Sequence, residues 1–219
     1  MRGAALLFDV DGTLTDTTYL HALAWWRALV DAGHDVATAA VHRLVGMGSS
    51  ELLTSLLGHD DPDLSEAHGR QYQRLKGEIR PLPGARDLLE QVSDRGATVV
   101  LATSAKKRDV GDLLRALDAD EWIDHVIDAG DVEAAKPEGD IFSAALEASG
   151  CPAERALVVG DTVWDVEAAA KVGLPTVAVL TGGHSTADLL DSGAVAVYRD
   201  AVDLLGQLDA SPVGQLLSS

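Results

Sequence analysis

Short apolar runs alternate with amphipathic helical stretches over residues 82–208, and no other feature constrains the fold of this chain as strongly. The apolar runs are typical of buried strands and lie at 98–102, 125–127, 156–159, 176–179 and 194–197. The stretches that predict helices lie at 86–95, 106–117, 140–149, 163–172 and 201–208. Gly96, Gly150 and Gly173 follow three of them, where a left-handed residue commonly ends a helix. This alternation predicts an α/β fold in which helices sandwich a mostly parallel, Rossmann-like sheet.

A long helical segment separates the first strand from the rest of this sheet. Residues 4–8 form an apolar run that ends in polar residues, as a buried parallel strand does. Helical spacing follows at Tyr19, Leu23, Trp26 and Val30, and further helices are expected near 37–45, 49–58 and 63–78. A proline- and glycine-rich turn at 81–84 ends this segment. We therefore expect a core domain of residues 1–14 and 82–219, an inserted all-helical domain of residues 15–81, and a loose tail from Ser211.

The acidic composition excludes several classes of partner. The 219 residues carry a formal net charge of −18, from 17 basic and 35 acidic side chains. Such a surface repels nucleic acid and anionic membranes. No apolar run is long enough to cross a bilayer, and the apolar N-terminus is too brief for a signal peptide. Cys151 is the single cysteine, which excludes an internal disulfide and suits a reducing compartment. We expect a cytoplasmic protein, a monomer or a weak homodimer, in which Cys151 has a structural role.

Polar residues follow three of the predicted strands. Asp9, Thr103 and Asp161 each come directly after a strand or one residue beyond it. Because the carboxyl ends of parallel strands meet at one edge of a sheet, we expect these side chains to share a pocket. Asp11 lies two residues after Asp9 and just before Gly12, so a turn could aim both carboxylates into that pocket. Two close carboxylates favour a bound cation or a shared proton, and one can then act as nucleophile while the other acts as acid or base.

Four short segments, far apart in the chain, carry a shared pattern. They are Asp9-Val10-Asp11-Gly12-Thr13-Leu14 with Asp16-Thr17, then Leu101-Ala102-Thr103-Ser104, Ala135-Lys136-Pro137-Glu138, and Val159-Gly160-Asp161-Thr162 with Asp165. In order and spacing they resemble the haloacid dehalogenase superfamily, specifically its phosphatase branch with a helical cap inserted after the first motif. The resemblance extends over essentially the whole chain.

The resemblance implies a phosphomonoesterase that acts on a small phosphorylated metabolite. By motif position, Asp9 would attack phosphorus and form an aspartyl-phosphate. Asp11 would protonate the leaving alkoxide and then deprotonate the attacking water. Thr103, with the backbone N–H of Ser104, would bind phosphoryl oxygens, and Lys136 would neutralise the phosphate and the nucleophile. These roles suit phosphoryl transfer, which depends mainly on positioning and on stabilisation of charge.

The resemblance also implies a magnesium ion. It would be held by the Asp9 carboxylate, the Asp11 backbone carbonyl and Asp161, with Asp165 as a further ligand or as support. Asp165 could instead merely cap a helix, where negative charge is favoured. The resemblance also implies that Gly12 is one of the residues that bind the phosphate. The seven histidines show no H-x-x-x-H pair and have no cysteine partners, so a zinc site is not expected.

Single residues distinguish the branches of this family. The dehalogenase branch lacks the second aspartate and needs no magnesium, so Asp11 argues against dehalogenation. Phosphonate cleavage through an imine needs a cap lysine, and residues 15–75 contain none. A sugar phosphate mutase remains open, because Asp16-Thr17 and His21 also resemble β-phosphoglucomutase. A packing or hinge role is the simpler explanation of His21. A non-catalytic phosphate-binding protein is disfavoured by the intact aspartates and lysine.

The cap loop at residues 43–51 is expected to contact the leaving group. Its R-x-x-V-G-x-G portion resembles phosphoglycolate phosphatases, which makes Arg43, Gly46 and Gly48 candidate substrate-binding residues. A plain interhelical turn is the alternative for the two glycines. Ser49 stands where β-phosphoglucomutase carries an arginine, and this favours a phosphatase. The candidate substrates are 2-phosphoglycolate and sugar phosphates, and one of the two cap tryptophans, at 25 and 26, could face them.

Overall fold

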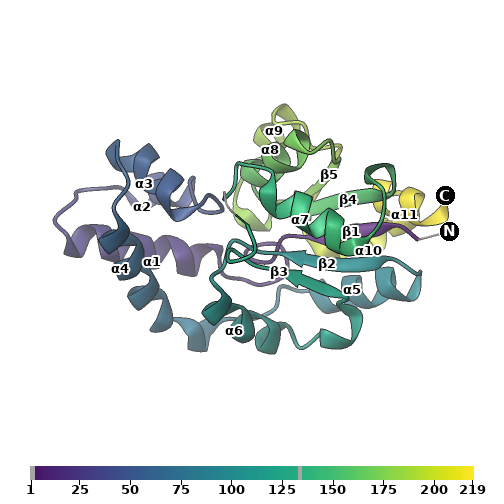
Figure 1. Ribbon diagram of the computed structural model, residues 1–219, viewed down its shortest axis with the longest axis horizontal. Coiled ribbons are helices and arrows are strands. Elements are labelled where there is room, and N and C mark those ends of the chain that lie inside the picture. Colours follow the sequence, from purple (N-terminus) through teal and green to yellow (C-terminus); the bar gives the residue numbers. More distant parts are fainter. Residues whose placement is uncertain (1–2, 133–134) are drawn as a thin grey trace.

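Six parallel strands form the central sheet of the computed structural model, which describes residues 3–132 and 135–219 (Figure 1). The strands are β1 (Ala5–Phe8), β2 (Thr98–Ala102), β3 (His125–Ile127), β4 (Ala156–Gly160), β5 (Thr176–Val179) and β6 (Ala196–Tyr198). Their order is β3-β2-β1-β4-β5-β6, and every neighbouring pair is parallel. The predicted α/β, Rossmann-like fold is confirmed.

Eleven α-helices occur among the described residues. Those of the inserted segment are α1 (Thr18–Asp31), α2 (Thr38–His42), α3 (Ser49–Leu57) and α4 (Pro62–Gln73). Those of the core are α5 (Ala85–Asp94), α6 (Lys107–Leu117), α7 (Asp140–Ser149), α8 (Val163–Lys171), α9 (Thr186–Asp191), α10 (Ala201–Gly206) and α11 (Pro212–Ser218). Short 3-10 helices lie at Lys76–Glu78, Asp120–Trp122, Ala153–Arg155, Leu180–Gly182 and Leu208–Ala210. Each helix predicted from the sequence is present within a few residues.

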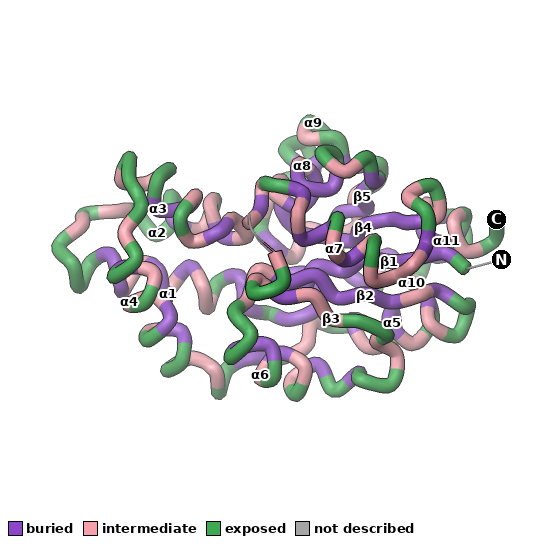
Figure 2. Tube along the Cα trace, viewed as in Figure 1, coloured by how far each residue is buried: buried purple, intermediate pink, exposed green. Residues whose placement is uncertain are grey.

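Helices cover both faces of the sheet because the side chains of a strand point alternately to opposite sides. In β1, Leu6 and Phe8 pack into an apolar cluster that includes residues of α5, α6, α10 and α11. Ala5 and Leu7 pack on the other face, against α7 and α8. All four side chains are fully buried, and Figure 2 shows the central strands as the most buried part of the chain. A strand that is covered on both sides must be apolar throughout, as this one is.

The helices α1 to α4 form a lobe beyond the carboxyl ends of the strands (Figure 1). The lobe has a small apolar cluster of its own, made by Trp25, Leu29, Val41, Leu52, Leu53 and Leu64. The chain enters and leaves it at one place, because Thr15 pairs with Pro81 in an antiparallel bridge. The N–H of Leu82 donates a hydrogen bond to the carbonyl oxygen of Leu14 at 2.9 Å. The domain boundaries at residues 15 and 81 remain predictions, and we refer to residues 15–81 as the cap.

The buried face of α1 differs from the predicted face. Tyr19 and Val30 are exposed, whereas the buried positions of the helix are Thr18, Ala22, Ala24, Trp25, Ala28 and Leu29. The helix carries apolar residues on two neighbouring faces. Its small alanines lie on the buried one and let the helix pack closely.

The C-terminal tail is not loose, and that expectation was wrong. Pro212 begins α11, and the Ser211 hydroxyl caps the helix by accepting a hydrogen bond from the N–H of Gly214 at 3.1 Å. Val213 is fully buried in the main apolar cluster. Cys151 is buried, and its thiol donates to the carbonyl oxygen of Gly3 at 3.3 Å, as suits a packing role. Among the residues that the structure describes, no helix is long and apolar enough to cross a membrane.

The centre of the sheet positions the predicted site. β1 lies between β2 and β4, so chain connections leave this point toward opposite edges of the sheet. Parallel sheets bind ligands at such a reversal, outside the carboxyl ends of the strands. Asp9 follows β1 and donates its backbone N–H to the carbonyl oxygen of Val159 in β4, at 2.9 Å. Asp161 follows β4 directly, so the two aspartates are neighbours.

Candidate active site

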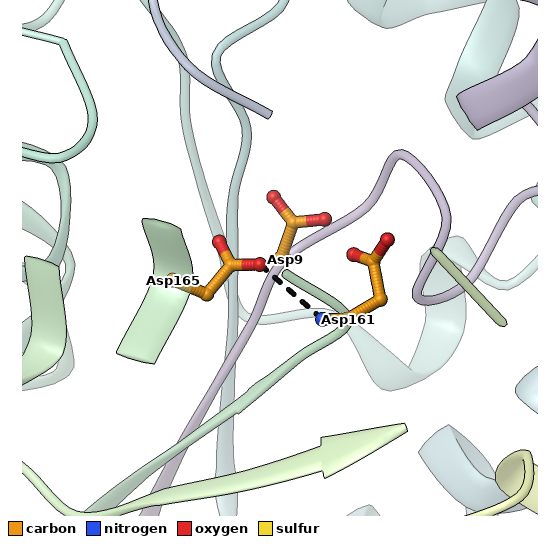
Figure 3. A group of neighbouring side chains, drawn as sticks. All are labelled: Asp9, Asp161 and Asp165. Carbon is orange, nitrogen blue, oxygen red and sulfur yellow. Dashed lines mark hydrogen bonds between the residues drawn. The ribbon is translucent and has the colours of Figure 1, made fainter. Parts of the chain in front are cut away.

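Three buried aspartates meet at the carboxyl ends of β1 and β4. Asp9, Asp161 and Asp165 are at most 5% exposed, and one carboxylate oxygen of each lies within 4.8 Å of the others. Figure 3 shows their carboxylates gathered on one side of the strand ends. Like charges in so small a volume repel each other, so the group needs a compensating cation.

Lys136 supplies one positive charge to this cluster. Its ammonium Nζ lies 2.5 Å from Asp9 Oδ1 and 2.7 Å from Asp165 Oδ1. The side chain is almost fully buried, and the ammonium also lies over the ring of Phe142, 5.1 Å from its centroid. Burial alone would lower the pKa of Lys136, but the carboxylates of Asp165 and Asp9 raise it above its ordinary value. Lys136 is therefore a fixed cation that holds two carboxylates together.

One lysine does not balance the aspartates. Burial, with smaller contributions from Asp165 and Asp11, raises the pKa of Asp9 to about 7 although Lys136 opposes this shift. Burial and the charges of Asp9 and Asp165 raise the pKa of Asp161 well above its ordinary value. The cluster thus favours a further cation or a bound proton.

Asp161 offers an unused oxygen to such a cation. Its Oδ1 accepts a hydrogen bond from Thr13 Oγ1 at 2.8 Å. Its Oδ2 is buried and has no hydrogen-bond partner among the described residues. A buried carboxylate oxygen without a partner is costly, and oxygen donors are the ligands that hard divalent cations prefer. The residues present therefore fit a divalent metal ion.

Asp165 has two roles in the structure. Its Oδ2 accepts hydrogen bonds from the N–H of Thr162 at 3.0 Å and from Thr162 Oγ1 at 2.7 Å, which completes a capping box at the start of α8. The same oxygen accepts the N–H of Asp161 at 3.2 Å (Figure 3). Its Oδ1 faces Lys136. Asp165 caps the helix and also orients Asp161 and Lys136.

Asp11 lies at the edge of the cluster, where the cap meets the core. Its Oδ1 accepts a hydrogen bond from Thr17 Oγ1 at 2.7 Å and lies 3.3 Å from His21 Nε2. Its Oδ2 accepts one from Thr103 Oγ1 at 3.1 Å. Burial raises the pKa of Asp11, but His21, Thr17 and Thr103 together lower it below its ordinary value. Asp11 is therefore held as a carboxylate.

Gly12 allows the first motif to turn closely around Asp161. Its φ is +93°, and a Cβ atom there would lie 2.2 Å from Asp161 Oδ2. Gly182 approaches the same oxygen from the other side, where a Cβ would lie 2.1 Å away. The role of Gly12 in phosphate binding stays a prediction. Its positive φ and its close approach to Asp161 explain why a glycine occupies this position.

A cavity of about 90 Å³ opens above the carboxylates, between the core and the cap. The core side is lined by Asp9, Asp11, Ser104, Ala105, Asp161, Thr162 and Asp165. The cap side is lined by His21, Trp25, Val45, Gly46, Met47, Gly48, Ser49, Leu52 and His68. The cavity thus brings together residues that were predicted from widely separated segments.

Both cap glycines contact the core as well as the cavity. Gly46 has a φ of +104°, and a Cβ there would lie 3.0 Å from the Thr162 side chain. A Cβ on Gly48 would lie 2.4 Å from the Cβ of Ala135. The N–H of Gly48 donates a hydrogen bond to the carbonyl oxygen of Lys136 at 3.0 Å. The cap loop is therefore docked on the core.

Arg43 does not line this cavity. It is exposed and lies in a separate cleft between α2 and the α8–α9 region, together with His42 and His184. The neighbouring Val41 is packed into the cap cluster. Its placement gives no support to the prediction that Arg43 binds substrate.

The sequence interpretation did not predict that one face of α1 would contribute side chains to the site. His21, for which a packing or hinge role was preferred, lies beside Asp11, and Trp25 lines the cavity. Thr17, His21 and Trp25 are spaced by four residues, which places them on one side of a helix, and this spacing was the available signal. His68 of α4 completes the wall. Its ring stacks on Trp25 with centroids 4.1 Å apart.

Comparisons with known proteins agree with this geometry. A family model for haloacid dehalogenase-like hydrolases matches residues 4–173. The chain is similar to a phosphorylated carbohydrates phosphatase of Thermotoga maritima, with 29% identity over 204 residues, 89% of this chain and 94% of that protein. It is 31% identical to a phosphoglycolate phosphatase of Caulobacter vibrioides over 218 residues, 93% of this chain and 90% of that protein.

A solved structure is also similar over nearly the full length. It is that of a hydrolase from Pseudomonas syringae, with 37% sequence identity and a TM-score of 0.89, covering 94% of this chain and 98% of that chain. The family match and these similarities accompany a buried group of aspartates and one lysine at the centre of the sheet. The chain belongs to the haloacid dehalogenase-like hydrolases.

Proposed function

We propose that this protein is a magnesium-dependent phosphomonoesterase that hydrolyses a small phosphorylated metabolite through an aspartyl-phosphate on Asp9. One observation carries the proposal. The Asp9 carboxylate lies on the cavity, 2.5 Å from the buried Lys136 ammonium and next to the unpartnered Oδ2 of Asp161. A carboxylate, a fixed cation and an unpartnered oxygen that suits a second cation lie close together, and this supports the proposal because transfer of a phosphoryl group requires such a combination.

The first chemical step belongs to Asp9. Its carboxylate attacks phosphorus, and the bond between phosphorus and the ester oxygen breaks. Lys136 balances the charge of the phosphoryl group, while the Thr103 hydroxyl and the backbone N–H of Ser104 bind its oxygens. Asp11 donates a proton to the departing alkoxide. A water molecule then attacks the aspartyl-phosphate, Asp11 accepts its proton, and inorganic phosphate leaves with Asp9 restored.

Asp11 needs a proton for the first step although its pKa is low in the structure. A phosphate ester that enters the cavity brings negative charge close to this carboxylate, and a like charge raises the pKa of a carboxyl group. Substrate entry would therefore favour the protonated form. The hydrogen bonds from Thr17 and His21 favour the carboxylate that the water step requires.

Asp9 and Asp161 would bind the metal ion directly, with the backbone carbonyl of Asp11 as a third protein ligand. Asp165 is the support of this group, because its two oxygens are engaged with Thr162 and Lys136. When bound, magnesium would offset the negative charge of the carboxylates and of the phosphoryl group that is being transferred.

The test is substitution of the nucleophile. Asp9→Asn keeps the size of the side chain and removes its nucleophilic carboxylate, so turnover of an aryl phosphate in the presence of magnesium is expected to fall by about 1,000-fold or more. Mass spectrometry after rapid acid quench is expected to detect a phosphorylated wild-type protein and none for the variant. Asp16→Asn changes an exposed aspartate in the same segment and is the matched control. Near wild-type turnover by the Asp9 variant would overturn the covalent mechanism.

A further inference from the structure

The cap side of the cavity is apolar where the leaving group of a phosphate ester would lie. Trp25, Val45, Met47 and Leu52 line it, and three of them, Trp25, Val45 and Leu52, are at most 6% exposed. These side chains also belong to or pack against the apolar cluster of the cap, with the exception of Val45. The wall is therefore a fixed part of the cap core, and polar groups on the leaving group would meet few partners there.

No arginine or lysine is among the described residues that line the cavity. His68 is not a cation either, because burial and the charge of His21 lower its pKa well below the ordinary value. Its ring is stacked on Trp25, and its Nε2 lies 3.2 Å from His21 Nδ1. The second histidine, His21, faces Asp11 and is engaged with it. An anionic leaving group would find no free positive charge on this wall.

Two other basic side chains, Lys106 and Arg108, also lie outside this wall. Lys106 lines a separate depression on the other side of Ser49, together with the acidic Asp60 and Glu66. Arg108 lies against the backbone of Gly69, where a Cβ atom would meet its guanidinium. Both cations contribute to the low pKa of His68 without lining the cavity.

The cavity is also small. The centre of a water molecule can occupy only about 90 Å³ of it. A phosphoryl group next to Asp9 occupies a large part of this space. With the cap docked as it is, only a compact leaving group fits.

We infer that the substrate of this enzyme is the phosphate ester of a compact, uncharged alcohol whose apolar part packs against Trp25 and Leu52. The inference rests on the proposed function and narrows it to one substrate class. It disfavours 2-phosphoglycolate, whose leaving group carries a carboxylate, and it disfavours a mutase, which must bind a second phosphate. Both would bury a negative charge without a partner, and such burial is strongly unfavourable.

A matched pair of substrates tests the charge. The pair consists of 2-phosphoglycolate and 2-phosphoglycolamide, which have nearly the same size and differ by one negative charge on the leaving group. With magnesium in excess, kcat/KM is expected to be at least about tenfold higher for the amide. Propyl phosphate, which has an apolar leaving group, is expected to be hydrolysed at least as well as the acid. Equal or higher kcat/KM for the acid would overturn the inference.

A charge placed in the cavity should reverse this preference. Ser49 lines the cavity, is half-buried and stands at the start of α3. Ser49→Arg is expected to raise kcat/KM for 2-phosphoglycolate relative to the amide by about tenfold, and the long but neutral side chain of Ser49→Gln is the control. Lys106→Gln is expected to leave the ratio unchanged. If the Lys106 variant selectively loses turnover of 2-phosphoglycolate, Lys106 binds the carboxylate of the leaving group and the inference is wrong.

An aryl phosphate separates failure of this inference from failure of the proposed function. Absence of turnover of every ester, p-nitrophenyl phosphate included, would overturn the proposed function and the inference together. Turnover of the aryl phosphate with a preference for the anionic ester would overturn the inference alone.

Discussion

The backbone N–H of Gly48 donates a hydrogen bond to the carbonyl oxygen of Lys136, with 3.0 Å between nitrogen and oxygen. This bond joins the cap loop to the residue whose ammonium holds Asp9 and Asp165 together. The same loop closes the cavity above these carboxylates. This contact therefore couples docking of the cap loop to the charged cluster, although the two segments lie far apart in the sequence.

Gly48→Ala is expected to lower kcat/KM by about 10- to 100-fold, because a Cβ atom at this position would lie 2.4 Å from the Cβ of Ala135 and the loop could not dock. The thermal midpoint should change little, since the strain is relieved by moving the cap loop. Gly77→Ala is the control, because a Cβ on this cap glycine meets nothing within 4 Å. Steady-state kinetics on one ester and thermal denaturation of both variants check the prediction, which wild-type kinetics for Gly48→Ala would contradict.

Asp161→Asn is expected to abolish binding of the metal ion and to lower turnover by about 100-fold or more. In metal-free buffer the same variant should be more stable than the wild type, because it removes one of three buried carboxylates. Burial, together with the charges of Asp9 and Asp165, makes the ionised form of Asp161 unfavourable and raises its pKa. Thermal denaturation with a chelator and with added magnesium measures both effects. A variant that is still stabilised by magnesium as much as the wild type would show that Asp161 is not a ligand.

The stability of the metal-free protein should fall as the pH rises from about 4 to 7. The pKa of Asp9 is raised from 3.8 to about 7, so over this interval the folded protein binds a proton that the unfolded chain has released. Stability falls with pH wherever the folded state binds more protons. Asp161 contributes with the same sign. Thermal midpoints measured with a chelator should therefore decrease over this interval.

Two controls attribute this pH dependence to the site. Asp9→Asn removes the titrating group and should give a flatter profile than the wild type. Added magnesium favours the ionised carboxylates and should reduce the loss of stability near neutral pH. A wild-type midpoint that rises between about pH 4 and 7 without metal would contradict the prediction.

The central residues of the candidate site could be predicted because they directly follow strands of the sheet. A buried parallel strand is recognisable as an apolar run, and the residue after it can only lie at one edge of the sheet. Asp9, Thr103 and Asp161 follow from this rule, and Lys136 followed from the resemblance of its segment to a known family. The buried triad of aspartates and the Lys136 contacts agree with these assignments.

The cap was predictable as helical but not in its orientation. The apolar residues of α1 occupy two faces, and either face could have been the buried one. The sequence pattern favoured the face with Tyr19 and Val30, which are exposed in the structure. Which face is buried depends on contacts with α4 and with the core, and these connect residues that are far apart in the chain. For the same reason the sequence interpretation placed Arg43 at the cavity, whereas in the structure Arg43 lines another cleft.

His21→Phe is expected to lower kcat by about tenfold and to move the acidic limb of the pH profile upward. The phenyl ring can keep the stacking on Tyr72, whose ring centroid lies 4.0 Å from that of His21, but it cannot contact Asp11. His21 helps to lower the pKa of Asp11, so its loss should raise that pKa toward the ordinary value, and Asp11 would become protonated at a higher pH than in the wild type. The lower kcat near neutral pH follows from the loss of the contact that orients the Asp11 carboxylate. The pH dependence of kcat for one ester, measured with wild type and variant, reports this shift. A lower kcat with an unmoved profile would assign His21 a purely structural role, because loss of packing alone does not change the ionisation of Asp11.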